Sequence, residues 1–238
     1  MKTFKHSGDM GDIIYSLPTI RSLGGGILYL DINNSIADHF TKKYFDILRP
    51  LILSQPYIQE VQIWSGEPIN HNLDLFRTNA SGKQVDLSFF NLCEAHLDRF
   101  NLDKNLKDEQ WLFVDFPLKY EEEFRTIIFA RSARYHNNDF NWNTIVNEYG
   151  RSAFFVGIQS EYDDFIKQYN CKNIPFKETK DLLNLARYIA GSELFVGNQS
   201  CPYAIAEGMK KNTILEVCSY SPNCLFERPN ARHHVYLK

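Results

Sequence analysis

This sequence lacks an apolar run long enough to cross a membrane. Its longest apolar stretches, at 27–30 and 153–158, are far shorter than the roughly 20 residues that a membrane-spanning helix needs. The first six residues, Met1 to His6, also lack the apolar core of a secretory signal. These absences predict a cytoplasmic protein without a membrane span.

A surplus of basic residues is missing as well. The 26 lysines and arginines are outnumbered by 29 aspartates and glutamates, and the formal net charge is −3. Affinity for nucleic acid depends largely on neutralising phosphates, so the overall charge gives no reason to expect a nucleic-acid-binding protein. The net charge does not, however, describe local basic clefts. Hydrophobic residues at 44% are ordinary for a soluble globular domain, which argues against a disordered chain.

The motifs of metal and dinucleotide sites are absent too. The five cysteines include no C-x-x-C pair and no cysteine–histidine cluster at zinc-site spacing, so we expect free thiols. The pair His233 and His234 has no third ligand nearby, which favours a surface pair over a metal site. The fingerprint G-x-G-x-x-G is reduced to Gly8-x-x-Gly11, which disfavours a nicotinamide enzyme. We therefore expect neither a metal nor a cofactor.

What the sequence does contain is an alternation of strand-like and helix-like segments, which predicts the α/β class with parallel sheets. In the first half, Pro18 and Pro50 are expected to interrupt the helices. The expected strands there are 3–6, 27–32, 61–64 and 85–90, and the expected helices are 12–23 and 35–53. Residues 66–84 have the composition of a loop, and 91–108 give no clear pattern.

The alternation is clearer in the second half. The expected strands are 126–130, 153–157, a short one near Asn173, 193–196 and 213–217, and the expected helices are 142–149, 162–169, 180–190 and 202–209. Before this half, a proline and a charge run at 116–123 suggest a junction. We therefore predict two domains, 1–118 and 119–238.

The turn after the first strand carries the first candidate motif, His6-Ser-Gly-Asp-Met-Gly-Asp12. Parallel α/β sheets bind ligands at the carboxyl ends of their strands, so this turn is expected at a binding edge. Gly8 and Gly11 would allow a ligand to approach the backbone closely. Asp9 or Asp12 could cap the following helix, or Asp12 could serve as an acid–base residue, and the spacing alone favours neither role.

The second candidate motif, Leu194 to Gly208, is a strand, a tight turn and a helix. Ser200 is a plausible N-cap and Pro202 suits the first helical turn. The exposed N–H groups of such a helix start can bind a diphosphate. An ordinary βα turn is the alternative explanation.

Together these segments resemble the lipopolysaccharide heptosyltransferases, glycosyltransferase family nine. Gly8-Asp-Met-Gly-Asp-Ile-Ile-Tyr-Ser-Leu-Pro-Thr-Ile20 resembles the opening signature of the family, and Phe195-Val-Gly-Asn-Gln-Ser-Cys-Pro202 resembles its donor-site turn. Phe155 to Glu161 is similar to the strand and turn whose glutamate contacts the donor. The resemblance implies a compact GT-B fold, in which two Rossmann-like domains face each other across a cleft.

The resemblance also implies roles for individual residues. Asp12 matches the general base of an inverting, metal-independent transfer from a nucleotide-sugar. The acceptor-side loop would comprise Ser7, Gly8, Asp9 and Gly11. The donor would be bound by residues of the second domain, namely Arg131, Arg134, Glu161, Asn198, Gln199, Ser200, Cys201, Glu207 and Glu216. For Glu216, a carboxylate at the end of an apolar strand, an ion pair with a neighbouring lysine is the alternative.

The sequence departs from the family pattern at the donor turn. Gln199 replaces an aspartate, Cys201 a glycine and Ala204 a histidine, while Phe140 stands where the family has a lysine. A binding protein that kept the site without the chemistry, or a nucleotide-sugar epimerase, are therefore alternatives to a glycosyltransferase. The expected partners are a nucleotide-sugar donor and a hydroxyl acceptor on a glycan, a protein or a modified nucleobase.

Overall fold

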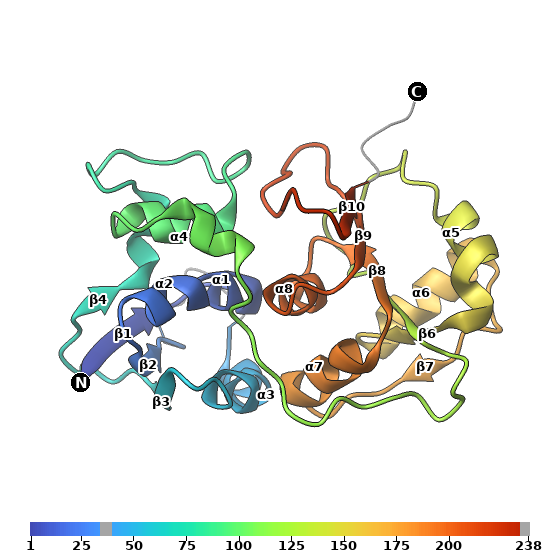
Figure 1. Cartoon of the computed structure of the whole chain (residues 1–238), viewed down its shortest axis with the longest axis horizontal. Helices are drawn as coiled ribbons and strands as arrows, with labels where there is room; N and C mark the ends of the chain where they lie inside the picture. Colours follow the sequence, from blue (N-terminus) through green and yellow to red (C-terminus); the bar gives the residue numbers. More distant parts are fainter. Residues whose placement is uncertain (34–39, 234–238) are drawn as a thin grey trace. The chain divides into compact units, whose positions relative to one another are not determined.

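A computed structural model describes residues 1–33 and 40–233, and the chain divides into two compact units (Figure 1). The first unit comprises residues 1–113 with 181–183, and the second comprises 114–180 with 184–238. Each unit is built around its own parallel sheet. The assignment of acceptor and donor roles to domains 1–118 and 119–238 stays a prediction.

The sheet of the first unit has four described strands in the order β3-β2-β1-β4, all parallel. They are β1 (Lys2–His6), β2 (Gly26–Leu30), β3 (Ile58–Ile63) and β4 (His71–Asn72). The α-helices are α1 (Met10–Tyr15), α2 (Leu17–Ser22), α3 (Lys42–Leu53) and α4 (Leu92–Arg99), with 3-10 turns η1 (Leu73–Arg77) and η2 (Lys104–Asp108). The expected interruption at Pro18 is confirmed, because α1 and α2 are separate and Pro18 lies in the first turn of α2.

Two predictions for this unit are wrong. Residues 85–90 form a turn and not a strand, because the Asp86 carboxylate accepts a hydrogen bond from the Ser88 N–H at 3.0 Å, which is an Asx turn. The edge of β1 is instead occupied by β4. Pro50 does not end α3, which continues to Leu53. Part of the helix expected at 35–53 lies outside the described residues.

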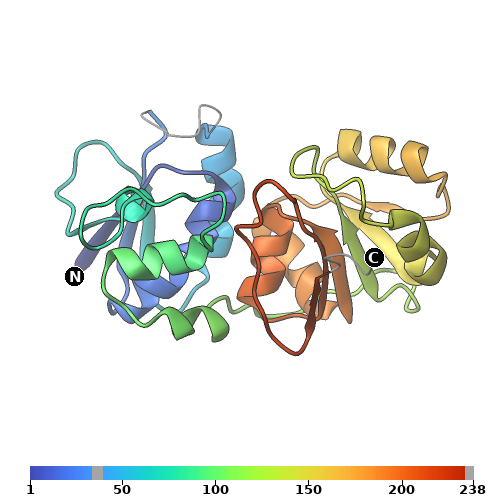
Figure 2. The same cartoon turned by 90° about the horizontal axis from the view of Figure 1, so that it is seen from above.

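The sheet of the second unit has six described strands in the order β10-β9-β8-β5-β6-β7, again all parallel. They are β5 (Ile127–Ala130), β6 (Ala153–Val156), β7 (Phe176–Lys177), β8 (Leu194–Asn198), β9 (Thr213–Glu216) and β10 (Ala231–His233). The α-helices are α5 (Trp142–Tyr149), α6 (Gln159–Tyr169), α7 (Leu182–Gly191) and α8 (Cys201–Gly208), with a 3-10 turn η3 (Gly150–Ser152). Helices α5 and α6 cover one face of the sheet, and α7 and α8 cover the other (Figures 1 and 2). The short strand expected near Asn173 is wrong, since β7 begins at Phe176.

An aromatic cluster holds this second sheet to α5 and α6. Phe129 on β5 and Phe155 on β6 both contact Phe165 of α6, with ring centroids 6.0 and 5.2 Å apart. Trp142 of α5 meets Phe165 edge to face at 5.0 Å. All four side chains are at most 2% exposed. Each such pair contributes roughly 0.5–1.5 kcal/mol beyond the area it buries, so the cluster fixes the helices that flank the candidate site.

Both sheets follow the strand order of the dinucleotide-binding fold, 3-2-1-4-5-6 or its first four members. The chain first builds outward from β1 or β5, and then returns to add β4 or β8 on the opposite side. The direction therefore reverses between β1 and β4 in one unit, and between β5 and β8 in the other. Ligands of open α/β sheets bind at such switch points, beyond the carboxyl ends of the strands.

Candidate functional site

The Asp12 turn lies at the switch point of the first sheet. It follows β1 and leads into α1, with Asp9 at the N-cap position and Asp12 in the first helical turn. The Asp9 carboxylate makes no capping hydrogen bond, so the simple capping role is not what the structure shows for it. Both aspartates are partly exposed, which leaves their carboxylates within reach of a ligand.

Two hydrogen bonds fix the shape of this turn. The Ser7 N–H donates to the Asp74 carboxylate at 2.6 Å, and the Gly8 N–H donates to Nδ1 of His6 at 2.9 Å. A Cβ on Gly8 would lie 2.7 Å from Cε1 of His6 and 3.0 Å from Oδ2 of Asp12, so only glycine fits there. At Gly11, by contrast, a Cβ would meet no atom within 4 Å.

A buried polar layer lies beneath the turn. The Lys5 ammonium is 3.1 Å from the Asp31 carboxylate and 3.2 Å from the Asp74 carboxylate. Burial lowers the pKa of Lys5, but the hydrogen bonds and charges of these two aspartates raise it more. The Lys5 ammonium is therefore paired with the Asp31 and Asp74 carboxylates.

Two histidines in this layer stay neutral at neutral pH. Burial lowers the pKa of His6 to about 4, although the Asp74 charge opposes the shift. Burial also lowers the pKa of His96 well below its usual value, while the backbone of Asp12 acts in the opposite direction. Both rings contact each other at 5.2 Å, and His96 stacks on Phe76 at 4.1 Å. Neutral rings can pack as apolar groups, so these two histidines support the turn without adding a positive charge of their own beside Asp12.

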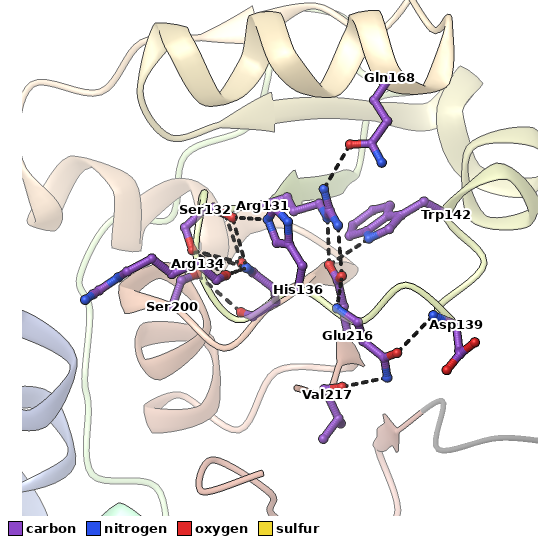
Figure 3. A network of polar contacts seen from close by, with 12 residues as sticks. Arg131, Ser132, Arg134, His136, Asp139, Trp142, Gln168, Ser200, Glu216 and Val217 are labelled. Atoms are coloured by element: carbon purple, nitrogen blue, oxygen red, sulfur yellow. Dashed lines mark hydrogen bonds and ion pairs between the residues drawn. The ribbon is translucent and has the colours of Figure 1, made fainter. Parts of the chain in front are cut away.

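The loop of residues 131–137 lies at the switch point of the second sheet, after β5 (Figure 3). Asn198, the last residue of β8, is fully buried and accepts a hydrogen bond from the Ser132 N–H at 2.9 Å. Its amide also donates to the backbone oxygens of Ser132 and Arg134. The predicted donor contact Asn198 thus holds the loop that carries the predicted contact Arg134, and Arg134 itself is exposed.

Arg131 and Glu216 form a buried ion pair at the same edge of the sheet. Nε and Nη2 of Arg131 lie 2.7 and 3.0 Å from the two carboxylate oxygens of Glu216. Glu216 also accepts hydrogen bonds from the Trp142 indole N–H and the Asn137 N–H, each at 2.8 Å (Figure 3). The expected alternative for Glu216, an ion pair with a neighbouring lysine, is wrong in its partner, which is an arginine 85 residues away.

A pocket of about 510 Å³ lies between this loop and α6. The Glu161 carboxylate, at the start of α6, accepts a hydrogen bond from the Ile158 N–H at 3.3 Å. Burial raises the pKa of Glu161, although backbone hydrogen bonds and His136 act against the shift. The polar residues of the lining include Arg131, Ser132, His136, Glu161, Asp164 and Gln168. Such a pocket is large enough for part of a small-molecule ligand and offers hydrogen-bond partners of both kinds.

The turn of residues 198–200, predicted to bind the donor, leads into α8. Ser200 occupies the N-cap position, but its hydroxyl donates to the Asn198 oxygen at 3.2 Å and makes no capping bond. Gln199 is buried and holds the segment after β9, since its oxygen accepts from the Cys218 N–H at 2.6 Å and its amide donates to the Ser221 oxygen at 2.7 Å. Cys201, at the first position of α8, forms no disulfide and is partly exposed.

Glu207 forms ion pairs with residues outside the loop 131–137. It is fully buried within α8 and pairs with Lys210 at 2.7 Å and with Arg228 at 2.8 Å. The structure thus groups Arg131, Arg134, Asn198 and Glu216 around one loop, and places Glu161 in the adjacent pocket. Donor contact stays a prediction for all of them.

Sequence reasoning missed three residues of this region: His136, Asn137 and Gln168. His136 and Gln168 line the pocket, and Asn137 joins the loop to Glu216. The order of loop residues after β5 carried the only signal, since His136 and Asn137 follow Arg131 and Arg134 on one connection. Among residues 1–33 and 40–233, no cluster of three or more metal-ligating side chains occurs and no helix could span a membrane.

No protein-family model and no curated protein matches the sequence, but solved structures do. Heptosyltransferase WaaC of E. coli, solved with ADP-2-deoxy-2-fluoro heptose, has a TM-score of 0.56 and 8% identity, over 98% of this chain and 92% of that one. The family 9 glycosyl transferase of Veillonella parvula has a TM-score of 0.54 and 12% identity, over 97% and 84%.

The E. coli heptosyltransferase TibC, solved with ADP-D-beta-D-heptose, has a TM-score of 0.60 and 16% identity, over 96% of this chain and 61% of that one. At such identities the likeness concerns the fold. It covers nearly the whole chain and includes both units. The chain therefore has the fold of the heptosyltransferases of glycosyltransferase family nine, as its motifs predict.

Proposed function

We propose that this protein is a glycosyltransferase that moves a sugar from a nucleoside diphosphate to an acceptor hydroxyl, with inversion and without a metal. One observation carries the proposal: each of the two family-like motifs lies at the switch point of its own Rossmann-ordered sheet. The fold supports it, because structures of the same fold were solved with ADP-heptose or its fluoro analogue.

The second unit would hold the donor. The nucleoside would occupy the pocket beside α6, where Glu161 can accept hydrogen bonds from sugar hydroxyls. The diphosphate would meet the exposed Arg134 side chain and the N–H groups at the start of α8. These groups would stabilise the negative charge that develops on the leaving diphosphate.

Asp12 would act as the general base. Its carboxylate takes the proton of the acceptor hydroxyl while the hydroxyl oxygen bonds to the anomeric carbon of the donor. The bond from that carbon to the diphosphate oxygen breaks, and its electron pair leaves with the nucleoside diphosphate. This role requires Asp12 to meet the donor, and its substitution tests that requirement.

The test compares Asp12→Asn with Asp9→Asn, a matched change on the same turn. We expect Asp12→Asn to lower kcat by about 10²- to 10⁴-fold, the usual contribution of a general base, with donor affinity changed less than about twofold. Asp9→Asn should retain most of the activity. Sugar transfer by Asp12→Asn at the parent rate would contradict the assigned role. Panels of glycan, peptide and hydroxylated-nucleobase acceptors would identify the acceptor.

A binding protein without transfer activity is the second candidate. Gln199 favours it, because this residue replaces the aspartate of the family and commits its amide to the Cys218 and Ser221 backbone. Calorimetry with nucleotide-sugars, followed by product analysis with and without acceptor, separates the candidates. Binding without any product supports this candidate, and a product formed without acceptor indicates an epimerase.

A further inference from the structure

Two buried side chains determine the shape of the loop 131–137. Asn198 uses its whole amide on this loop: the oxygen accepts from the Ser132 N–H at 2.9 Å, and the nitrogen donates to the Ser132 oxygen at 3.1 Å and to the Arg134 oxygen. Its exposed fraction is 0%. Burying this amide costs free energy, and the cost is offset only while its hydrogen-bond partners stay in place. The amide therefore favours one loop conformation.

Glu216 fixes the other end of the same loop. One carboxylate oxygen accepts from the Asn137 N–H, and the two oxygens together hold the Arg131 guanidinium in a bidentate pair (Figure 3). The Asn137 amide donates to the Val217 oxygen at 2.8 Å, which ties the loop to the residue after Glu216. Inside the loop, a ring nitrogen of His136 lies 2.6 Å from the Ser132 oxygen.

The backbone between these two anchors is strained. Tyr135 has a φ of +58°, in the left-handed region that residues with a Cβ rarely adopt. Such a conformation persists only where the surrounding structure determines it, and it is concentrated at ligand sites and active sites. Here the surrounding structure is Asn198, bonded to residue 134, and Glu216, bonded to residue 137. Arg134, whose side chain is exposed, is the residue just before Tyr135.

We propose that Asn198 and Glu216 are positioning residues, which touch no ligand but hold the loop 131–137 so that Arg134 meets a diphosphate. This inference rests on the proposed function, and it changes the expected role of both residues from donor contact to support of a donor contact. A guanidinium held in place before the ligand arrives loses less conformational freedom on binding, so binding is tighter.

The first experiment tests the support without any ligand. Asn198→Leu removes the amide with little change in volume and no added charge, and Asn212→Leu is the control, the same change at an exposed asparagine just before β9, at the opposite end of the same sheet. We expect the Ser132 and Asn137 amide hydrogens to exchange at least tenfold faster in Asn198→Leu and unchanged in the control. Equal exchange in wild type and Asn198→Leu would overturn the inference. If the leucine variant does not fold, Asn198→Ser replaces it, because its hydroxyl is too short to bond both carbonyls.

The second experiment tests whether Asn198 acts through Arg134. Binding of ADP, UDP, GDP and inorganic pyrophosphate is measured for wild type, Arg134→Ala, Asn198→Leu and the double variant. Loss of the charged hydrogen bond from Arg134 predicts about tenfold weaker binding for Arg134→Ala, and Asn198→Leu should weaken binding by a similar factor if it disrupts that contact. If Asn198 acts through Arg134, the double variant binds within about threefold of the weaker single variant. A multiplicative loss of about 100-fold would show independent action and overturn the inference.

The probes separate this inference from the proposed function. Pyrophosphate binding with the predicted coupling, but no binding of any nucleoside diphosphate, supports the loop and contradicts the proposed donor. Nucleoside diphosphate binding that is unchanged by Arg134→Ala and Asn198→Leu supports the proposed donor and contradicts the positioning role of Asn198. Binding of none of the four probes overturns both.

Discussion

Replacing Glu216 by glutamine is the sharpest test of the site, because it preserves shape and removes only charge and one acceptor. Glu216 is fully buried and accepts four hydrogen bonds, two of them from Arg131. In either orientation of the glutamine, two of the groups that donate to Glu216 would face the NH₂ group, which is itself a donor. Arg131, only 8% exposed, loses its counter-charge at the same time.

The cost can be worked from these contacts. Hydrogen bonds to charged groups contribute about 1.5–3 kcal/mol each, so losing two predicts about 3–6 kcal/mol. Breaking a buried ion pair by removing one partner typically costs about 3–5 kcal/mol, which agrees. At about 2–4 °C per kcal/mol for a chain of 150–250 residues, the expected fall in Tm is roughly 6–24 °C.

Thermal melting followed by circular dichroism measures this fall, with Glu178→Gln as the control on an exposed carboxylate of the same unit. Arg131→Met combined with Glu216→Gln should cost less than the sum of the single variants, since the buried cation is then gone as well. A Glu216→Gln shift no larger than that of Glu178→Gln would refute the reasoning. Additive losses in the double variant would refute the pairing.

Three further outcomes follow from the first unit and from ligand binding. The pKa of His6 falls from 6.5 to about 4 on folding, so the unfolded state binds more protons than the folded state between these pH values. The free energy of unfolding is therefore highest above pH 6.5 and falls by about 3 kcal/mol as the pH approaches 4. The lowered pKa of His96 acts in the same direction, so His96→Phe should reduce the loss of Tm between pH 7.5 and 4.5, and an unchanged loss would contradict its burial as a neutral ring. Gly8→Ala should cost about 1–3 kcal/mol by overpacking against His6 and Asp12, whereas Gly11→Ala, in open space within a helix, should be neutral or stabilising by up to about 1 kcal/mol; equal urea midpoints for the two variants would contradict the geometry. A nucleoside diphosphate at 100 times its Kd should stabilise the protein by about 2.7 kcal/mol, and the absence of any Tm shift across ADP, UDP and GDP would count against the donor site.

The elements of the second unit were largely readable from the sequence. The helix expected at 142–149 is α5, Trp142–Tyr149, and the strands β5, β6, β8 and β9 lie within two residues of their expected bounds. The strands of this unit are buried on both faces, so they appear in the sequence as continuous apolar runs between helical patterns. The two-residue strands β4 and β7 could not be read, because two residues carry no periodicity. Helix α4 did carry a signal, since Asn91 caps it by accepting from the N–H groups of Cys93 and Glu94.

The sequence by itself determined the α/β class and the two motif-bearing turns, because glycine spacing and apolar periodicity are local properties. Only the tertiary structure decided what the polar residues around those turns contact. Glu216 meets Arg131 across 85 residues, and Asn198 meets Ser132 across 66, through the pairing of β5 with β8 and of β8 with β9. Such partners are set by strand order, and strand order depends on how whole helices and strands pack. For that reason the sequence could not show that Asn198 and Glu216, two predicted donor contacts, form hydrogen bonds to the loop 131–137.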